Sequence, residues 1–374
     1  MINKIEIENF KSIKNAIIDT GYLNVFTGVN GSGKSSFLQS LLLLRQSFNS
    51  GSFFRNPFSL NLGSKDSLVN LGTFKDVLCQ HAEKNNERIS INVDINKKNL
   101  SFVSENYDTD NRDLNFLNGK LNQNISNFEN ANLFTGNFQY LAAERIQPSE
   151  DYPRFQSTEF LGKQGEYTAH FIEKYKNDDI PIRALSFKEK PISFSLINQI
   201  NDWMGEISDS IEVIVKENLN INRIELSYRY RHLDGIPSQN QKPQNVGFGI
   251  THTLPIVVAI LSAKPNDIIV IENPETHLHP KGQSALSYLF SLAAQNNVQL
   301  FIETHSDHII NGLRVAVKKN MIDKDNIYLY YFTKTNKNIS DINRIRVQME
   351  GGLDIWPPNF FDQATRDLNY LFGI

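Results

Sequence analysis

Two different spacings of apolar residues alternate over the first 50 positions. Residues 2–7 and 16–18 show the spacing of β-strands, and residues 21–27 form an apolar run typical of a buried strand. Residues 35–48 instead repeat apolar positions every three or four residues, which predicts a helix with a wide apolar face. The chain is therefore expected to open with strands that lead through a glycine-rich loop into a helix.

The middle of the chain is more polar and less regular. Residues 74–78 and 89–95 predict strands, whereas 105–132, rich in Asn and Asp, predicts loops and hairpins at a sheet edge. A further apolar strand is expected at 140–143, and helical spacing over 197–214 predicts a helical lobe.

Strict alternation returns at residues 221–231 and predicts a strand. Arg223, Arg229 and Arg231 are expected on one face of this strand. They would either contact a phosphate backbone or lie on an ordinary solvated face.

The last third of the chain follows a regular order. From residue 245 it reads loop, helix, strand, loop, helix, strand, helix, which is typical of an α/β fold with helices on the faces of a parallel sheet. Residues 351–374 begin with glycines and prolines and predict a short amphipathic helix.

Composition narrows the class of protein. The chain has 374 residues, 40% of them hydrophobic, and a formal net charge of -3. Any nucleic acid would therefore have to bind at a local patch. A single cysteine, Cys79, excludes a disulfide within the chain. No apolar run is long enough for a bilayer span and no signal-peptide pattern opens the chain, so a cytoplasmic protein without membrane contact is expected.

The predicted strand at 21–27 runs into a complete phosphate-binding loop pattern, Gly28-Val29-Asn30-Gly31-Ser32-Gly33-Lys34-Ser35. Glycines let backbone N–H groups turn toward phosphate oxygens, and the following helix presents its N-terminus to that charge. Lys34 is expected to reach the outer phosphates of ATP, and the Ser35 hydroxyl to hold Mg²⁺. The predicted nucleotide-binding residues of this loop are Asn30, Gly31, Gly33, Lys34, Ser35 and Ser36.

An apolar strand at 268–271 ends in a group of acids and an amide. Glu272 is expected to bind Mg²⁺ through water, because a buried parallel strand that ends in a carboxylate is typical of a metal-binding acid. Glu275 lies just past the strand end and would orient or deprotonate the attacking water. Asn273 between them would position water.

Histidines follow this strand and the next one. His277 and His279, two residues apart and without nearby cysteines, give only weak support for a zinc site. Residues 300–306 repeat the pattern of an apolar strand with a polar end. His305 there would either donate to the γ-phosphate or be an ordinary structural histidine.

A second glycine-rich loop, with Gly247 and Gly249, precedes the helix that ends near residue 263. In isolation it would simply begin a helix. Two glycines at a helix N-terminus also form an anion site. Because the first loop already holds one side of its own nucleotide, this loop indicates a nucleotide that belongs to a second subunit.

Together these motifs resemble those of ABC-type ATPases of the SMC, RecF and OLD group. Residues 5–14, the phosphate loop, 246–250, 272–280 and 303–306 occur in the expected order. The chain is most similar to compact, stand-alone bacterial ATPases of the AAA family whose acid motif reads Glu-Asn-Pro-Glu and which end in a small domain of unknown function. Genes of this kind often occur in anti-phage defence loci, beside a nuclease or another effector.

The resemblance implies an ABC-ATPase-like P-loop head with a mixed sheet, an inserted helical lobe and a small C-terminal domain. The expected division is an N-terminal ATPase part with a β-rich lobe at 1–145, the helical lobe at 146–220, the second ATPase part at 221–335 and the C-terminal domain at 336–374. It also implies an ATP-sandwich homodimer with Mg²⁺, in which each phosphate loop faces the Gly247 loop of the other chain.

Three departures from the group bear on activity. Asn273 stands where a second acid is usual, so either Glu275 substitutes for it or hydrolysis is slow. The glutamine that usually senses Mg²⁺ has no clear counterpart, and Gln139 is a candidate. The chain also lacks room for the nuclease domain of OLD proteins, so it is not expected to cut DNA alone.

Several functions fit this set of motifs. The first is an ATP-hydrolysing dimer that senses DNA or phage components and controls a partner effector in anti-phage defence. The alternatives are an ATP-gated clamp with hardly any hydrolysis, or a DNA repair or recombination ATPase. A small-molecule kinase would need only the phosphate loop and would leave Gly247, Gly249 and His305 unexplained.

Overall fold

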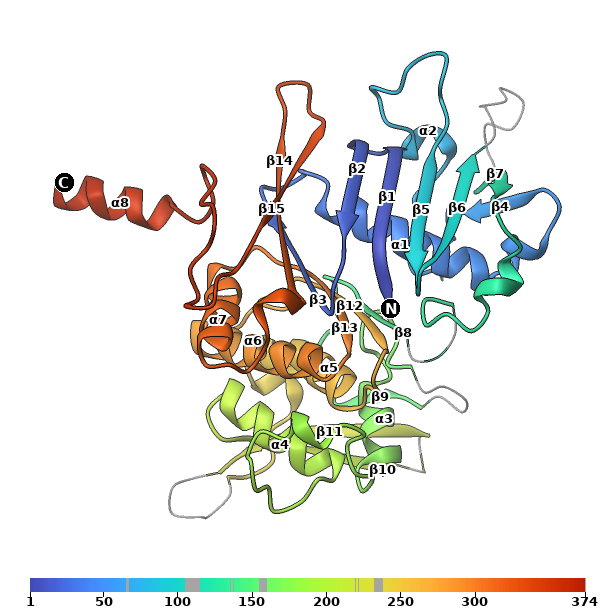
Figure 1. Cartoon of the computed structure of the whole chain (residues 1–374). Helices are drawn as coiled ribbons and strands as arrows, with labels where there is room; N and C mark the ends of the chain where they lie inside the picture. Colours follow the sequence, from blue (N-terminus) through green and yellow to red (C-terminus); the bar gives the residue numbers. More distant parts are fainter. Residues whose placement is uncertain are drawn as a thin grey trace.

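The computed structural model describes residues 1–64, 67–104, 115–134, 136, 138–154, 160–218, 220, 222–231 and 238–373. This part of the chain is organised by three sheets (Figure 1). A mostly parallel sheet lies at the centre. An antiparallel sheet lies on one side of it, at the upper right of Figure 1, and a smaller sheet with two helices lies below.

The central sheet has the strand order β15-β14-β3-β13-β12-β8. Its strands are β3 (Leu23–Gly28), β8 (Phe138–Leu141), β12 (Ile268–Glu272), β13 (Gln299–Glu303), β14 (Ile327–Lys334) and β15 (Ser340–Ile345). All neighbouring pairs are parallel except β14–β15, which is antiparallel. The mixed sheet with a parallel centre confirms the predicted α/β fold class.

Helices cover both faces of the central sheet, which is why the parallel strands β12 and β13 at its centre are almost entirely apolar and buried. Leu23 and Val25 of β3 join one core cluster, whereas Phe26 joins the other. One face packs against α5 (Phe248–Leu261), α6 (Pro280–Gln295) and α7 (Asp307–Lys318), and the other against α1 (Lys34–Asn49).

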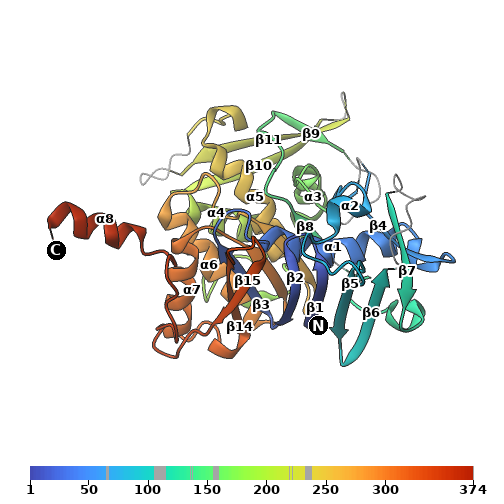
Figure 2. The ribbon, with the colours of Figure 1, turned by 90° about the horizontal axis from the view of Figure 1, so that it is seen from above.

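The antiparallel sheet packs on the far side of α1, so that this helix lies between two sheets (Figure 2). Its order is β2-β1-β5-β6-β7-β4. The strands are β1 (Ile2–Phe10), β2 (Ile13–Asp19), β4 (Phe58–Asn61), β5 (Ser90–Ile95), β6 (Lys98–Ser104) and β7 (Phe116–Leu121). The predicted strands near residues 2–7, 16–18 and 89–95 are confirmed.

The predicted strand at 74–78 is wrong, because most of it is the short helix α2 (Phe74–Val77). Thr73 and Asp76 form a reciprocal capping box, in which each side chain satisfies a backbone N–H at the helix start. This local pairing prevails over the apolar alternation of the segment.

The lower lobe contains strands as well as the expected helices. Its elements are α3 (Thr168–Tyr175), α4 (Leu196–Ile207), β9 (Asp151–Pro153), β10 (Ile211–Asn218) and β11 (Arg223–Tyr230). The helix predicted over 197–214 ends at Ile207, because Ser210 takes a positive φ of 60° and Ile211 begins the strand that pairs with Tyr230. The domain boundaries stay predictions.

The C-terminal segment ends in α8 (Gln363–Phe372), which confirms the predicted short helix and extends away from the body (Figures 1 and 2). Short 3-10 turns lie at Ser52–Phe54, Ile125–Phe128, Arg183–Leu185, Pro243–Asn245 and Lys324–Asn326. Within the described residues, no helix has the length and apolar character that a bilayer span requires.

Candidate nucleotide site

The predicted site residues gather where the parallel strands of the central sheet end. β13 lies between β3 and β12, and Glu303 at its end is paired in register with Phe26 on one side and Glu272 on the other. The phosphate loop follows β3 directly at Gly28. The strand order therefore places the loop, Glu303 and Glu272 side by side at one edge of the sheet, where open α/β sheets bind their ligands.

The phosphate loop needs glycine at two tightly enclosed positions. Gly28 has a φ of 140°, and a Cβ there would lie 2.0 Å from the carbonyl oxygen of Phe332. Gly33 has a φ of 105°, and its Cβ would lie 2.2 Å from Ser340 Oγ. Gly33 also begins α1 without a side-chain cap, so the helix N-terminus is left for an anion.

Lys34 is buried in the loop. Its Nζ donates to the carbonyl oxygens of Gly28 at 3.1 Å and Val29 at 2.9 Å. Burial lowers the pKa of Lys34, and Glu303 and Glu275 oppose that shift through their charges. The ammonium group thus lies within the electrostatic reach of both acids, as a phosphate-binding lysine next to a metal site should.

Ser35 contacts an acid that the sequence analysis did not assign. Its Oγ donates to Glu303 Oε1 at 2.9 Å, whereas Glu272, the predicted metal partner, lies one strand further from β3. Burial and the charge of Glu272 raise the pKa of Glu303 to about 7. The pairing Ser35–Glu303 follows from strand order, which no motif along the chain reveals.

Glu272 is held by two other groups. Its Oε1 accepts from the Tyr140 hydroxyl at 3.1 Å, and its Oε2 accepts from the Ala143 N–H at 3.3 Å. Burial raises the pKa of Glu272. Together with Ser35 and Glu303 it forms a set of hard oxygen donors, the kind that Mg²⁺ prefers, so the residues present fit the predicted cation.

Glu275 is bound to the segment that follows β13. It accepts from Thr304 Oγ1 at 2.8 Å and from the His305 N–H at 2.6 Å. Burial and Lys34 lower the pKa of His305, while Glu275 and a hydrogen bond with the Gly28 backbone oppose this. The structure therefore brings His305 to the phosphate loop and fixes its backbone through Glu275.

Asn273 stands in a strained backbone conformation between the two acids. Its φ is 45°, its N–H donates to the Glu303 carbonyl oxygen at 2.8 Å, and its Oδ1 is buried without a partner among the described residues. The backbone N–H of Asn273 therefore connects the end of β12 to the end of β13.

Arg145 is a further residue that the sequence analysis missed. It is 3% exposed, and its guanidinium donates to the carbonyl oxygens of Glu272 at 2.6 Å and Asn273 at 3.3 Å. Burial lowers its pKa to about 10, against the charges of Glu275 and Glu272. It thus holds the backbone turn that carries both predicted catalytic acids. The only hint in the sequence is an arginine two residues after the apolar strand predicted at 140–143.

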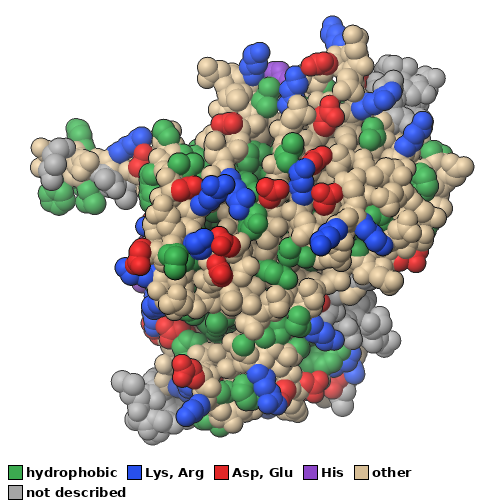
Figure 3. Space-filling model, in the orientation of Figure 1, with side chains coloured by type: hydrophobic (Ala, Val, Ile, Leu, Met, Phe, Trp, Pro, Cys, Tyr) green, Lys and Arg blue, Asp and Glu red, His purple; other side chains and the backbone are tan. Residues whose placement is uncertain are grey.

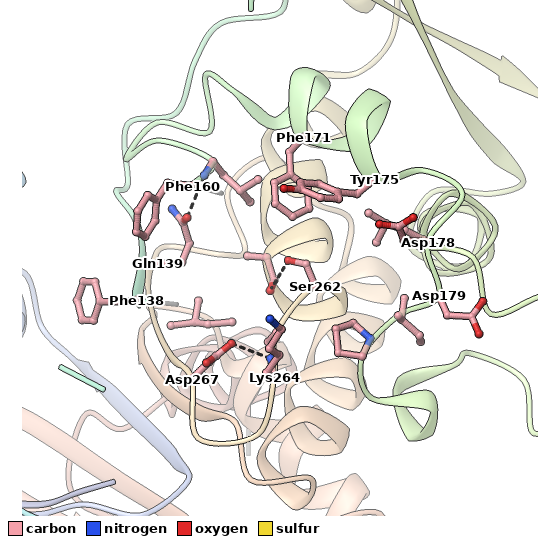
Figure 4. A pocket seen from close by; sticks show the side chains of 17 residues that line it. Phe138, Gln139, Phe160, Phe171, Tyr175, Asp178, Asp179, Ser262, Lys264 and Asp267 are labelled. Atoms are coloured by element: carbon pink, nitrogen blue, oxygen red, sulfur yellow. Dashed lines mark hydrogen bonds between the residues drawn. The ribbon is translucent and has the colours of Figure 1, made fainter. Parts of the chain in front are cut away.

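Gln139, the candidate for sensing Mg²⁺, is bound elsewhere. Its Nε2 donates to the Gly162 carbonyl oxygen at 3.0 Å and its Oε1 accepts from the Leu161 N–H at 3.1 Å. It pairs with Ile269, near the start of β12, and lines a cavity of about 220 Å³ with aromatic walls (Figure 4). No residue of the phosphate loop lines this cavity.

Gly247 in the second glycine loop has open space around it, unlike Gly28 and Gly33 in the phosphate loop. Gly247 is the N-cap of α5, and a Cβ there would meet no atom within 4 Å, whereas a Cβ on Gly249 would lie 2.3 Å from the His277 carbonyl oxygen. Both glycines line a cavity of about 290 Å³ to which His279 and Lys281 also contribute. No residue of the phosphate loop lines this cavity either.

The two histidines next to that loop have other contacts. The His277 ring packs against Phe248 and His252, with centroids 5.9 and 5.4 Å apart, and His279 Nδ1 accepts from the Lys281 N–H. Over the described ranges, no group of three or more His, Cys, Asp or Glu side chains has the arrangement of a metal site.

Fold and site together define a P-loop ATPase of the AAA and SMC-head type. Residues 23–311 match the family described as "AAA domain, putative AbiEii toxin, Type IV TA system", and the chain belongs to this family. Residues 322–371 match a family described as "Protein of unknown function (DUF3696)". These matches confirm the predicted resemblance, including the C-terminal domain of unknown function.

One solved structure has the same fold. An SMC head bound to the C-terminal winged-helix domain of ScpA is 13% identical over 93% of this chain and 98% of its own, with a TM-score of 0.51. The SMC head domain from Thermotoga maritima is 14% identical over 92% of this chain and 99% of its own, with a TM-score of 0.44. No curated protein matches the chain.

Proposed function

We propose that this chain binds Mg²⁺–ATP between its phosphate loop and the Gly247 loop of a second copy, and hydrolyses it slowly. The observation that carries the proposal is the separation of the two loops within one chain. Lys34, Ser35 and His305 gather at one edge of the central sheet, whereas Gly247 lines a different cavity with open space around it. Each loop supplies half of a triphosphate site.

The residues around the phosphate loop have distinct roles. Lys34 gives up the carbonyl oxygens of Gly28 and Val29 and pairs with the outer phosphates. Ser35, and Glu272 through water, would hold Mg²⁺, and the cation would supply positive charge next to the phosphates. Glu275, through its bonds to Thr304 and the His305 backbone, keeps His305 at the γ-phosphate and orients water.

One observation favours the alternative of an ATP-gated clamp. The residue after Glu272 is Asn273, and an amide cannot accept the proton of the attacking water. Both oxygens of Glu275, the substitute, already accept hydrogen bonds. This arrangement favours slow hydrolysis. In the clamp alternative, ATP stays bound and unhydrolysed for as long as the dimer persists, so that binding alone controls its function.

We also propose that the dimer controls a partner effector in anti-phage defence. The family description names a putative toxin of a toxin–antitoxin system, which supports a role in conflict with a target cell or phage. Direct binding of DNA by the predicted arginines has less support. Arg223 pairs with Asp151, and Arg229 and Arg231 both pair with Glu212.

The first experiment compares the purified wild-type chain with Lys34→Ala. Loss of a charged partner of the phosphates is expected to weaken ATP binding on the order of 100-fold. The wild type should form an ATP-dependent dimer in light scattering and turn over bound ATP in single-turnover assays, and the variant should do neither. Wild-type activity equal to that of Lys34→Ala, with and without DNA, would contradict the enzymatic proposal. A nucleotide lifetime of many minutes that Glu275→Gln leaves unchanged would establish the clamp.

The defence role has a separate test in cells. The chain is expressed with its neighbouring gene, and phage plating is compared for wild type and Lys34→Ala. Protection that requires Lys34 supports the proposal. Stimulation of the ATPase by DNA ends, with no effect on phage, would instead support repair or recombination.

A further inference from the structure

Glu303 lies at the centre of the candidate nucleotide site, although the sequence alone assigned it no role. It ends β13, the strand between β3 and β12, and is paired in register with Glu272. Only 5% of the residue is exposed. Its Oε1 lies 2.9 Å from Ser35 Oγ, the hydroxyl at the start of α1 that is predicted to hold the cation.

The surroundings of Glu303 leave its carboxylate half satisfied. Oε2 is buried and has no hydrogen-bond partner among the described residues. Lys34 influences it through charge, but the Lys34 Nζ donates to the carbonyl oxygens of Gly28 and Val29. Buried polar atoms are nearly always paired, and an unpaired carboxylate oxygen is among the most costly to bury. The position therefore lacks a partner that carries positive charge.

Glu272 differs in this respect from its neighbour. Both of its oxygens already accept hydrogen bonds, from the Tyr140 hydroxyl and the Ala143 N–H. Its oxygens are oriented by protein donors, whereas Oε2 of Glu303 has none. Of the two facing acids, Glu303 is both closer to Ser35 and freer to bind a cation.

We infer that Glu303 is a direct ligand of the nucleotide's Mg²⁺, together with Ser35. Glu272, one strand further from the phosphate loop, interacts with this cation indirectly. This inference rests on the proposed nucleotide site. It assigns the free Oε2 to the metal and explains why a carboxylate is buried beside the serine of the phosphate loop. Carboxylate and hydroxyl oxygens are suitable ligands for a small hard cation that keeps several waters.

The test uses Mn²⁺ in place of Mg²⁺, because bound Mn²⁺ is read directly by electron paramagnetic resonance without any turnover. Mn²⁺ is titrated into the full chain with a slowly hydrolysed ATP analogue, for wild type, Glu303→Gln and Glu303→Asp. Loss of a direct ligand should weaken Mn²⁺ binding by more than about 100-fold in Glu303→Gln, which exceeds the roughly 10- to 100-fold effect of losing a group that only orients a ligand, with partial recovery in Glu303→Asp. Binding of the analogue in EDTA should stay unchanged.

Two controls keep the outcome specific. Glu129→Gln removes an exposed carboxylate on the antiparallel-sheet side and should leave Mn²⁺ affinity unchanged. Thermal melting in EDTA shows whether Glu303→Gln folds. If it does not fold, Glu303→Asp supplies the comparison.

Mn²⁺ binding by Glu303→Gln that is unchanged, tighter or weakened by less than about 100-fold would overturn the inference, because Glu303 would then at most orient the Ser35 hydroxyl. A wild type that binds nucleotide in EDTA but holds no Mn²⁺ would overturn the metal role alone. A wild type that binds no nucleotide under either condition would overturn the proposed function and this inference together.

Discussion

The two glycine loops of this protein differ in how far their own chain completes them. In the phosphate loop, Gly28 and Gly33 are enclosed by Phe332 and Ser340. Lys34 is buried there and donates to the carbonyl oxygens of Gly28 and Val29. At the Gly247 loop, a side chain would meet nothing within 4 Å. The first loop is enclosed by its own chain, whereas Gly247 in the second loop has open space around it.

The same contrast occurs within the second loop and shows that its openness is local. A Cβ on Gly249 would collide with the His277 carbonyl oxygen, two residues after Glu275. Gly249 is thus required for packing against the acid-bearing turn, and Gly247 is not. We therefore attribute packing to Gly249 and reserve ligand contact across a dimer for Gly247.

The largest effect is expected from Gly247→Glu. The new carboxylate would face the triphosphate of the second copy, and a like-charge contact of this kind costs several kcal/mol, so ATP-dependent self-association should weaken on the order of 100-fold. Analytical ultracentrifugation with and without ATP measures it.

Gly247→Ala is the matched control. It adds a methyl group into open space at a φ of -59°, which suits any residue, so both melting temperature and dimerisation should stay close to wild type. Nucleotide binding by monomers should survive in both variants. A Gly247→Glu chain that dimerises with wild-type affinity would show that the open loop has another use.

A second prediction concerns Glu303 beside the phosphate loop. Because this acid is buried, the free energy of unfolding should depend on pH. The folded pKa of Glu303 is about 7, raised from 4.5 by burial and by Glu272. The folded state therefore binds this proton more tightly than the unfolded state, and the stabilisation grows as pH falls below about 7. In EDTA, wild type should gain about 2 kcal/mol over Glu303→Gln between roughly pH 8.5 and 5.5.

Denaturant titrations of both proteins across this range give the difference directly. Subtracting the Glu303→Gln curve removes the contributions of other groups, such as His252, whose pKa is lowered to about 4 by burial. If the free energy of unfolding depended on pH in the same way for both proteins, Glu303 would have an ordinary pKa. Its carboxyl group would then be more solvated than its burial indicates.

Much of the fold could be predicted from the chain because its central strands are apolar on both faces and alternate with helices. One error, at the end of α4, falls where the helical spacing and the strand spacing of apolar residues overlap. Ile207 and Ile211 share the helical spacing of α4, yet Ile211 also begins the alternation of β10, and pairing with Tyr230 decides between them.

The site shows a different limit. Lys34 and Ser35 were predictable because their chemistry depends on neighbours along the chain, as in any phosphate loop. Glu303 and Arg145 were not, because their roles depend on which strand lies beside which. Strand order is a property of the whole packed sheet, and no local pattern encodes it.

The smallest effects are expected from the arginines beside the open loop. Arg229 and Arg231 flank Tyr230, which lines the Gly247 cavity, and both pair with the buried Glu212. Each Arg→Ala change should cost less than about 1 kcal/mol, because the other arginine still neutralises Glu212. The double change leaves that carboxylate unpaired and should exceed the sum of the two. Denaturant unfolding measures this coupling, and DNA affinity and ATP-dependent dimerisation should not move. A drop in DNA affinity or in ATP-dependent dimerisation would mean that these arginines belong to a charged binding surface next to the Gly247 loop. The lower lobe would then take part in the interface together with that loop.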